Sequence, residues 1–300
     1  MTTRRRFFSI LAGAAVLPAF GMPASANVAQ WRGIALGAEA RIILDHPDAD
    51  RLIAVAVSEI QRLENIFSLY RSNSQLSRLN RNGSLQNPAF EMVELLSICS
   101  NLNARTNGAF DPSIQPLWAL HAAAYSAGST PDAKDISRTL EMTGWQHIRF
   151  SPDEIHFERR GMALTLNGIA QGFIADKVTD LFRLNGVENV LVNTGEIAAL
   201  GVQPDGREWQ VELKGFKGRH VTLRGTAVAT SAPLGTTFDA GGTVGHILDP
   251  RTGYPGGIWE SVSVISNSAA EADGLSTAFC LMTQPEISAA KGQNEVYLKG

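Results

Sequence analysis

The fold of this chain is constrained most by the order of its hydrophobic patterns: apolar residues at helical spacing come first, and short strand-like runs follow. Apolar residues recur at helical spacing over 48–67, and again from Asn87-Pro88, which is typical of a helix start, to Asn107-Gly108. A third helix is predicted over 173–184. Short runs rich in β-branched residues follow, and we expect strands at 190–192, 209–213, 221–223, 227–230 and 262–266.

Helices that precede a strand-rich half indicate an α+β fold rather than a regular βαβ alternation. Glycine- and proline-rich stretches such as 201–206 and 241–245 are typical of loops within one domain. The chain has 300 residues, 44% of them hydrophobic, which suffices for one large domain or two small ones. We expect a single α+β domain over 27–300, with a mixed or antiparallel sheet and packed helices.

The charge of the chain argues against nucleic-acid binding. The formal net charge is −3, and no basic stripe with interleaved aromatic residues is visible. We therefore expect no nucleic-acid partner.

The first 26 residues have the pattern of an export signal. Three arginines at 4–6 precede an apolar run over 10–20, and Ala24-Ser25-Ala26 has the form of a cleavage site. The segment 3–8 resembles a twin-arginine signal, with an ordinary secretory signal as the alternative. The residue directly after the cleavage site is not a cysteine. No later apolar run reaches the ~18–20 residues of a membrane helix. We expect a soluble periplasmic protein that is neither a lipoprotein nor membrane-spanning.

The chain has two cysteines, and both lie within apolar helical patterns. An oxidising compartment would permit a disulfide between Cys99 and Cys280, and the sequence does not decide whether they meet. Their spacing fits no metal or redox site, and we favour two small buried hydrophobic residues.

The most informative helix is predicted near the C-terminus. Ser268 and Glu271 are spaced as a capping box, so the helix begins there. Asp273, Ser276 and Thr277 follow at helical spacing and share one side of the helix. One carboxylate and two hydroxyls near a helix N-terminus suit Mg²⁺ together with a phosphate group. The alternative is a helix whose polar residues face solvent.

A second segment, 164–176, is predicted to run from a strand through a turn of small residues into a helix. Gly168 and Gly172 would let the backbone approach a ligand closely, or would serve tight packing between strand and helix. The segment matches neither the dinucleotide-binding fingerprint nor a P-loop.

Three further segments combine aromatic and ionisable residues: 67–70, 107–112 and 246–255. The last contains His246 among an acid, an arginine and rigid turn residues. A single histidine beside a strand is usually structural, but this crowding in a turn favours a functional role. The sequence contains no nucleophile elbow with a Ser-His-Asp order and no Cys/His cluster with zinc spacing.

Seven motifs in order resemble the ApbE family of FAD:protein FMN transferases, and the likeness covers nearly all of the chain after the signal. The motifs are F-S-x-Y at 67–70, S-x-L-S-R-L-N at 74–80, T-N-G-A-F-D-P at 106–112, G-I-A-Q-G-F at 168–173, V-N-T-G-E-I at 192–197, H-I-L-D-P-R-T-G-Y-P at 246–255 and E-A-D-G-L-S-T-A at 271–278.

The resemblance implies roles for individual residues. His246 is implied as the catalytic base, and Asp273, the magnesium acid, is implied as a second catalytic residue. The implied magnesium ligands are Gly168, Asp273, Ser276 and Thr277. The implied FAD contacts are Leu36, Tyr70, Ala109, Phe110, Asp111, Thr165, Gln171 and Ile247.

Three positions depart from the family pattern. Thr165 stands where the family commonly has Asp, and Gln171 replaces the usual Lys or Glu. Leu36 replaces the usual Met, which is close in volume. The magnesium acid Asp273 is kept, so FAD binding and catalysis remain the expectation.

The resemblance implies Mg²⁺-dependent transfer of FMN from FAD to a Thr or Ser hydroxyl of a partner protein, with release of AMP. The implied acceptors carry an Asp-x-x-Ser/Thr-Gly-Ala-Thr segment, as in NosR, the Rnf complex or sodium-pumping NADH:quinone reductase. The export signal and short C-terminus are similar to the NosX branch, which serves NosR. Two alternatives remain open: a pyrophosphatase that splits FAD into FMN and AMP, and a non-catalytic flavin carrier.

Overall fold

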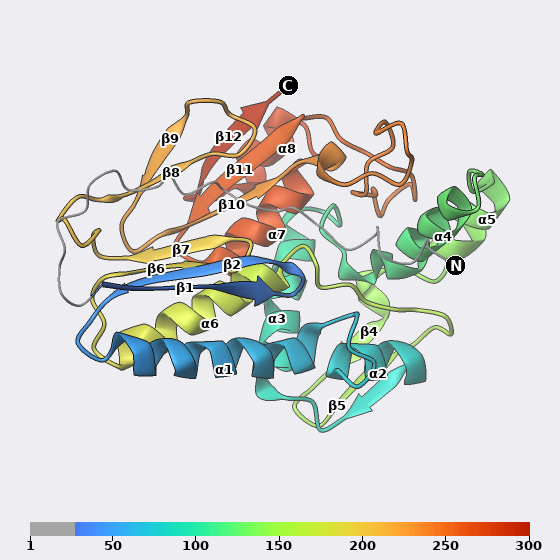
Figure 1. Cartoon of the computed structure of the whole chain (residues 1–300). Coiled ribbons are helices and arrows are strands. Elements are labelled where there is room, and N and C mark those ends of the chain that lie inside the picture. The colour runs from blue at the N-terminus through green and yellow to red at the C-terminus, as the bar shows by residue number, and fades with distance from the viewer. Residues whose placement is uncertain (1–27) are drawn as a thin grey trace.

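The computed structural model describes residues 28–300, and the predicted signal at 1–26 lies outside the described residues. A seven-stranded sheet crosses the molecule in the order β1-β2-β6-β7-β10-β11-β12, and every neighbouring pair is antiparallel (Figure 1). Its strands are β1 Val28–Ala35, β2 Ala38–Asp45, β6 Val190–Asn193, β7 Ile197–Leu200, β10 Ala227–Ser231, β11 Ser261–Ser266 and β12 Glu295–Lys299.

Two smaller sheets accompany the central one. They comprise β3 Ser84–Gln86, β4 Ile148–Phe150 and β5 Glu154–Phe157 in one, and the hairpin of β8 Trp209–Glu212 and β9 His220–Leu223 in the other. The α-helices are α1 Ala49–Phe67, α2 Gln75–Asn82, α3 Phe90–Arg105, α4 Gln115–Ser126, α5 Ala133–Leu140, α6 Ala170–Leu184, α7 Ala269–Phe279 and α8 Gln284–Ala290. Short 3₁₀ turns are η1 Pro112–Ile114, η2 Trp145–His147 and η3 Pro233–Gly235. The expected α+β class is confirmed.

The inner strands β6, β7, β10 and β11 are buried on both faces of the central sheet, which explains why β6 and β7 are apolar without alternation. In β6, Val190 and Val192 pack into the large core, in which residues of α1, α3, α6 and α7 also lie. Leu191 between them packs on the opposite face, where the β8–β9 hairpin forms a second core around Trp209 and Val211. In Figure 1 the helices α1, α3 and α6 lie below the sheet and the hairpin lies above it.

The hydrophobic patterns of the sequence predicted three helices and five strands. The helix predicted over 48–67 is α1, and the five predicted strands are β6, β8, β9, β10 and β11, with bounds within a residue or so. The helix predicted from Asn87 starts later, at Phe90. Asn87 itself adopts a left-handed φ of 48° in a turn, and its N–H donates to the carbonyl of Asp153. The helix predicted over 173–184 begins earlier, at Ala170.

Helix α7 is buried on nearly all sides, so the alternative, a helix whose polar residues face solvent, is wrong. Ser268 caps it by accepting from the Glu271 N–H, as predicted. The second bond of a capping box, in which the Glu271 side chain would reach back to the cap residue, is replaced by other contacts. The Glu271 carboxylate accepts from Arg105 and Asn294 instead, while Asp176 of α6 accepts from the Ala269 N–H at 2.7 Å and the Ala270 N–H at 3.0 Å. A carboxylate at these amides also complements the helix dipole.

Cys99 and Cys280 are buried free thiols, which confirms their interpretation as small hydrophobic residues. Among residues 28–300, no helix combines the length and the apolar character that a bilayer crossing demands.

The packing of α6 on α7 generates a prediction. Gly172 lies against the start of α7, where an added Cβ would collide with the backbone carbonyl of Ala269. We expect Gly172→Ala to lower the free energy of unfolding by about 3 kcal/mol, because neither helix backbone can yield without breaking the caps on α7. Chemical denaturation checks this value. Leu184→Ala, an exposed position on the same helix, should unfold like the unchanged protein, and equal stability of the two variants would contradict the prediction.

Candidate functional site

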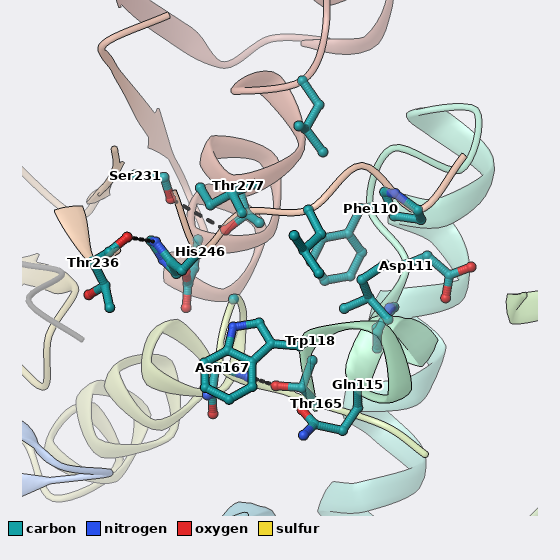
Figure 2. A pocket seen from close by; sticks show the side chains of 18 of the residues that line it. Phe110, Asp111, Gln115, Trp118, Thr165, Asn167, Ser231, Thr236, His246 and Thr277 are labelled. Atoms are coloured by element: carbon teal, nitrogen blue, oxygen red, sulfur yellow. Dashed lines mark hydrogen bonds between the residues drawn. The ribbon is translucent and has the colours of Figure 1, made fainter. Parts of the chain in front are cut away.

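A cavity of about 380 Å³ opens beside α7, large enough for a small-molecule ligand. Its walls come from segments far apart in the sequence: the end of α1, the 109–118 region, the 165–168 turn, the end of β10, the 246–250 loop and α7. Figure 2 shows these side chains converging from opposite sides on one space.

Most of the residues predicted as site residues line this cavity. They are Tyr70, Ala109, Phe110, Asp111, Thr165, Gly168, His246, Ile247, Asp273 and Thr277. The fold thus brings residues of five of the seven sequence motifs together around one space.

Three predicted residues do not line the cavity. Leu36 occupies the hairpin turn between β1 and β2 with a left-handed φ of 47°, and its N–H donates to the buried Glu64 carboxylate at 2.6 Å. The Gln171 side chain is buried and packs where a Cβ on Gly195 would be. Ser276 is fully buried in α7. These three side chains do not line the cavity as it stands in the described structure.

Asp273 presents a buried carboxylate at the cavity. Its Oδ2 accepts from the Gly172 N–H at 3.1 Å, which ties α7 to the start of α6. Burial raises the pKa of Asp273 to about 7, the hydrogen bond from Gly172 opposes the shift, and the nearby charge of Asp176 adds to it. Since the carboxylate is poorly compensated, a cation in the cavity would favour its ionised form.

A second buried acid lies close to the first. Glu196, in the turn between β6 and β7, accepts from the Thr230 N–H at 3.2 Å. Burial first, and the Asp273 charge second, raise the pKa of Glu196 well above its usual range. The sequence motif at 192–197 contains Glu196. The sequence could not show that this acid lies near Asp273, because the proximity arises only in the fold.

The hydroxyl groups beside Asp273 form a connected set. The Ser231 hydroxyl, at the end of β10, lies 2.8 Å from Ser276 Oγ and 3.3 Å from Thr277 Oγ1, and Figure 2 shows the bond to Thr277. Gly168 approaches Thr277 so closely that a Cβ on Gly168 would lie 3.0 Å from Thr277 Oγ1. The glycine therefore brings backbone of the 165–168 turn next to the threonine hydroxyl, as its predicted role requires.

His246 is fixed in one tautomer by two backbone groups. Its Nδ1 lies 3.0 Å from the Thr236 carbonyl oxygen and 3.2 Å from that of Pro233. Carbonyl oxygens only accept, so Nδ1 carries the proton and Nε2 has the free lone pair. Burial lowers the pKa of His246 and these hydrogen bonds partly restore it, so the ring is neutral at pH 7 and can accept a proton at Nε2.

The turn that carries Phe110 and Asp111 is held rigidly. Asn107 adopts a left-handed φ of 50°, and the Phe110 N–H donates to the Thr106 hydroxyl at 3.0 Å. Both oxygens of Asp111 accept backbone N–H groups, from Ser113 and Trp145. Burial raises the pKa of Asp111, while those hydrogen bonds favour its ionised form.

Aromatic side chains also line the cavity. Tyr70 is about half exposed, and Phe110 is buried in the wall. Trp118 also lines the cavity, from helix α4, whose existence the sequence analysis did not predict. In the view of Figure 2 the Trp118 indole lies across the open space from Thr277. The cavity therefore offers polar groups at Asp273 and Thr277, its polar end, and flat rings at Tyr70 and Trp118, its aromatic end, a combination that suits a ligand with phosphate groups and planar rings.

The donor set at the polar end fits a hard divalent cation. Across residues 28–300 no group of three or more His, Cys, Asp or Glu side chains is placed to hold a metal. Mg²⁺ needs no such group, since it binds through one or two carboxylates plus ligand phosphates and water. The Asp273 carboxylate and the Thr277 hydroxyl supply hard oxygens, with backbone at Gly168 beside them.

Comparisons with known proteins identify the family. A sequence model of the ApbE family matches residues 34–297. A FAD:protein FMN transferase of Klebsiella pneumoniae (strain 342) is 31% identical over 249 residues, covering 77% of this chain and 76% of that protein. The apo crystal structure of Pseudomonas stutzeri flavinyl transferase ApbE superposes with a TM-score of 0.80 at 29% identity, covering 91% and 90% of the two chains. The apbe protein of Thermotoga maritima gives a TM-score of 0.81 at 25% identity, covering 91% and 94%.

The two carbonyl acceptors at His246 generate a prediction. In ¹⁵N-histidine NMR spectra at pH 7, the ring should be the neutral Nδ1–H tautomer, with a titration midpoint below 6.5. Because its pKa is lower in the folded than in the unfolded state, its contribution to stability is present above pH 6.5 and is lost as the pH falls. A His246→Asn variant assigns the signal. An Nε2–H tautomer, or a midpoint above 6.5, would be incompatible with the structure.

Proposed function

The chain belongs to the ApbE family, and from this premise we propose that it is an FAD:protein FMN transferase. It moves the FMN part of FAD to a Thr or Ser hydroxyl of a partner protein and releases AMP. The observation that carries the proposal is one cavity in which a buried carboxylate, a neutral histidine and aromatic side chains face each other.

The proposed orientation of FAD follows from the two ends of the cavity. The pyrophosphate lies at the polar end, near Asp273 and Thr277. Flat rings lie toward the aromatic end, where Tyr70 and Trp118 offer stacking surfaces. Phe110, Ala109 and Ile247 supply apolar contacts, while Thr165 and the turn at Asp111 supply polar ones. Leu36 and Gln171, implied as FAD contacts by the resemblance, do not line the cavity.

The proposed cofactor is Mg²⁺, held by Asp273 and Thr277 with backbone oxygen at Gly168. When bound there, it supplies positive charge that neutralises phosphate oxygens as the pyrophosphate bond breaks. The fully buried Ser276, predicted as a further ligand, donates to the Asp273 carbonyl and bonds to Ser231. We therefore assign it a supporting role beside the cation rather than direct contact.

The proposed transfer is a displacement at phosphorus. The acceptor hydroxyl oxygen bonds to the phosphorus on the riboflavin side of FAD, and the bond from that phosphorus to the bridging oxygen breaks. AMP leaves with the bridging oxygen. The hydroxyl proton passes to Nε2 of His246, whose Nδ1–H is already committed to the Thr236 carbonyl. The protein contributes mainly position and a fixed electrostatic environment, as in other phosphoryl transfers.

The location and the acceptor are also proposals. The export pattern at 1–26 supports a periplasmic protein that leaves the cytoplasm folded, through the twin-arginine route. The acceptor is proposed to carry an Asp-x-x-Ser/Thr-Gly-Ala-Thr segment in NosR, the Rnf complex or the sodium-pumping reductase. Similarity to the NosX branch favours NosR among these.

A transfer assay tests the function. The protein is incubated with FAD, Mg²⁺ and a purified acceptor that carries the Asp-x-x-Ser/Thr-Gly-Ala-Thr segment. We expect a mass gain equal to one FMN residue on the acceptor and an equal amount of AMP. Asp273→Asn should slow transfer on the order of 100-fold or more, because the carboxylate is removed from the proposed protein ligands of the cation. Intact-protein mass spectrometry and nucleotide chromatography measure both products.

Asp153→Asn is the matched control, since it removes the same charge at an exposed position and should transfer normally. AMP release without any acceptor would identify a pyrophosphatase. Retention of FAD with no turnover would identify a flavin carrier. Undiminished transfer by Asp273→Asn would refute the metal assignment.

A further inference from the structure

Ser231 is a cavity residue to which neither the sequence motifs nor the proposed reaction assign a role. It is the last residue of β10 and lies directly before the turn η3. Its hydroxyl is shared between two residues of α7, at 2.8 Å from Ser276 Oγ and 3.3 Å from Thr277 Oγ1. It therefore touches Thr277, a proposed cation ligand, and Ser276, to which the proposed function assigns a supporting role.

The direction of these hydrogen bonds follows from the neighbouring backbone. The Ser276 hydroxyl donates to the Asp273 carbonyl oxygen at 3.0 Å, so its single hydrogen is committed within α7. In its bond with Ser231, Ser276 can then only accept, and the Ser231 hydrogen points to Ser276. The oxygen of Ser231 is left as an acceptor, and the hydrogen that it accepts comes from Thr277.

These hydrogen-bond directions orient the Thr277 hydroxyl. Its hydrogen is drawn toward Ser231, away from the cavity space beside Asp273, and its lone pairs remain for that space. A hydroxyl can bind a cation only through a lone pair, so this orientation is the one that a ligand needs. Without Ser231, the same hydroxyl could turn its hydrogen toward the cavity or toward a neighbouring carbonyl.

The support under Ser231 is rigid. Ser231 pairs with Val262 of β11, and β10 is also paired with β7 at Ala227 and Val228. The preceding residue, Thr230, donates its N–H to the buried Glu196 carboxyl and shares its hydroxyl with Ser263. A hydroxyl held in this way can orient a partner, because it cannot follow the partner when that partner rotates.

We propose that Ser231 is a positioning residue that turns the Thr277 hydroxyl into an oxygen ligand for a divalent cation beside Asp273. The inference rests on the proposed function, since the cation is the one that assists FMN transfer. Its effect is on cation affinity in the FAD-bound protein rather than on FAD binding itself.

Direct binding of Mn²⁺ tests the inference. Mn²⁺ has the same preference for hard oxygen ligands as Mg²⁺ and its free form is measured by electron paramagnetic resonance. The full chain after the signal is loaded with FAD and titrated with Mn²⁺, without acceptor. We expect Ser231→Ala to bind Mn²⁺ on the order of fivefold more weakly, the effect of losing one orienting hydrogen bond. FAD affinity without metal, from flavin fluorescence, should stay the same.

Two further variants separate orientation from stability. Ser261→Ala removes another buried strand hydroxyl, one that donates to the Lys214 carbonyl and does not line the cavity. It should bind Mn²⁺ like the unchanged protein. Ser231→Thr keeps the hydroxyl and should restore most of the affinity. Thermal melting without metal confirms that the variants compared are folded.

The outcomes are distinguishable. Equal Mn²⁺ affinity of Ser231→Ala and Ser261→Ala would overturn the inference, and so would weakened FAD binding in the absence of metal, since Ser231 would then act on the nucleotide. If Ser231→Thr binds as weakly as Ser231→Ala, size rather than the hydroxyl matters and the inference also fails. If the unchanged FAD-bound protein takes up no Mn²⁺, the metal assignment of the proposed function fails, independently of Ser231.

Discussion

The contact between the start of α6 and the start of α7 is the constraint on which the site depends. Gly172 has no side chain, and so the two helices meet backbone to backbone. Asp176 of α6 accepts the first amides of α7, and Asp273 of α7 accepts the Gly172 N–H in return. These reciprocal bonds fix where the Asp273 carboxylate lies. Because the same turn enters α6 from Gly168, they also fix the backbone that faces Thr277.

This arrangement carries an electrostatic cost that the proposed chemistry relieves. Asp273 and Glu196 are both buried, and burial disfavours the charged form of each. A fold under selection for stability alone would place apolar residues here, since uncompensated buried acids destabilise a protein. A divalent cation bound with its phosphate ligand supplies the missing positive charge. The site is therefore most stable in the state in which it is proposed to act.

The sequence predicted the elements whose signal is local. Helix α1 and strand β6 follow from their own hydrophobic pattern, and the capping role of Ser268 from its neighbours. The β1 and β2 hairpin and helix α4 carry weaker patterns, since one edge strand is half exposed and α4 has no polar face of helical period. Trp118 was missed with its helix. Ser231 was missed because its role depends on α7, 45 residues away.

The predicted site residues include some that do not line the cavity. The Leu36 N–H bonds to Glu64, the Gln171 carbonyl accepts from the Thr194 hydroxyl, and Ser276 bonds to Ser231. The segment from Ser231 to Thr236 shows why such support matters. The Ser231 hydroxyl bonds to Thr277, while the Pro233 and Thr236 carbonyls hold His246. One short segment thus positions both the proposed base and a proposed cation ligand, and a displacement of it would disturb both together.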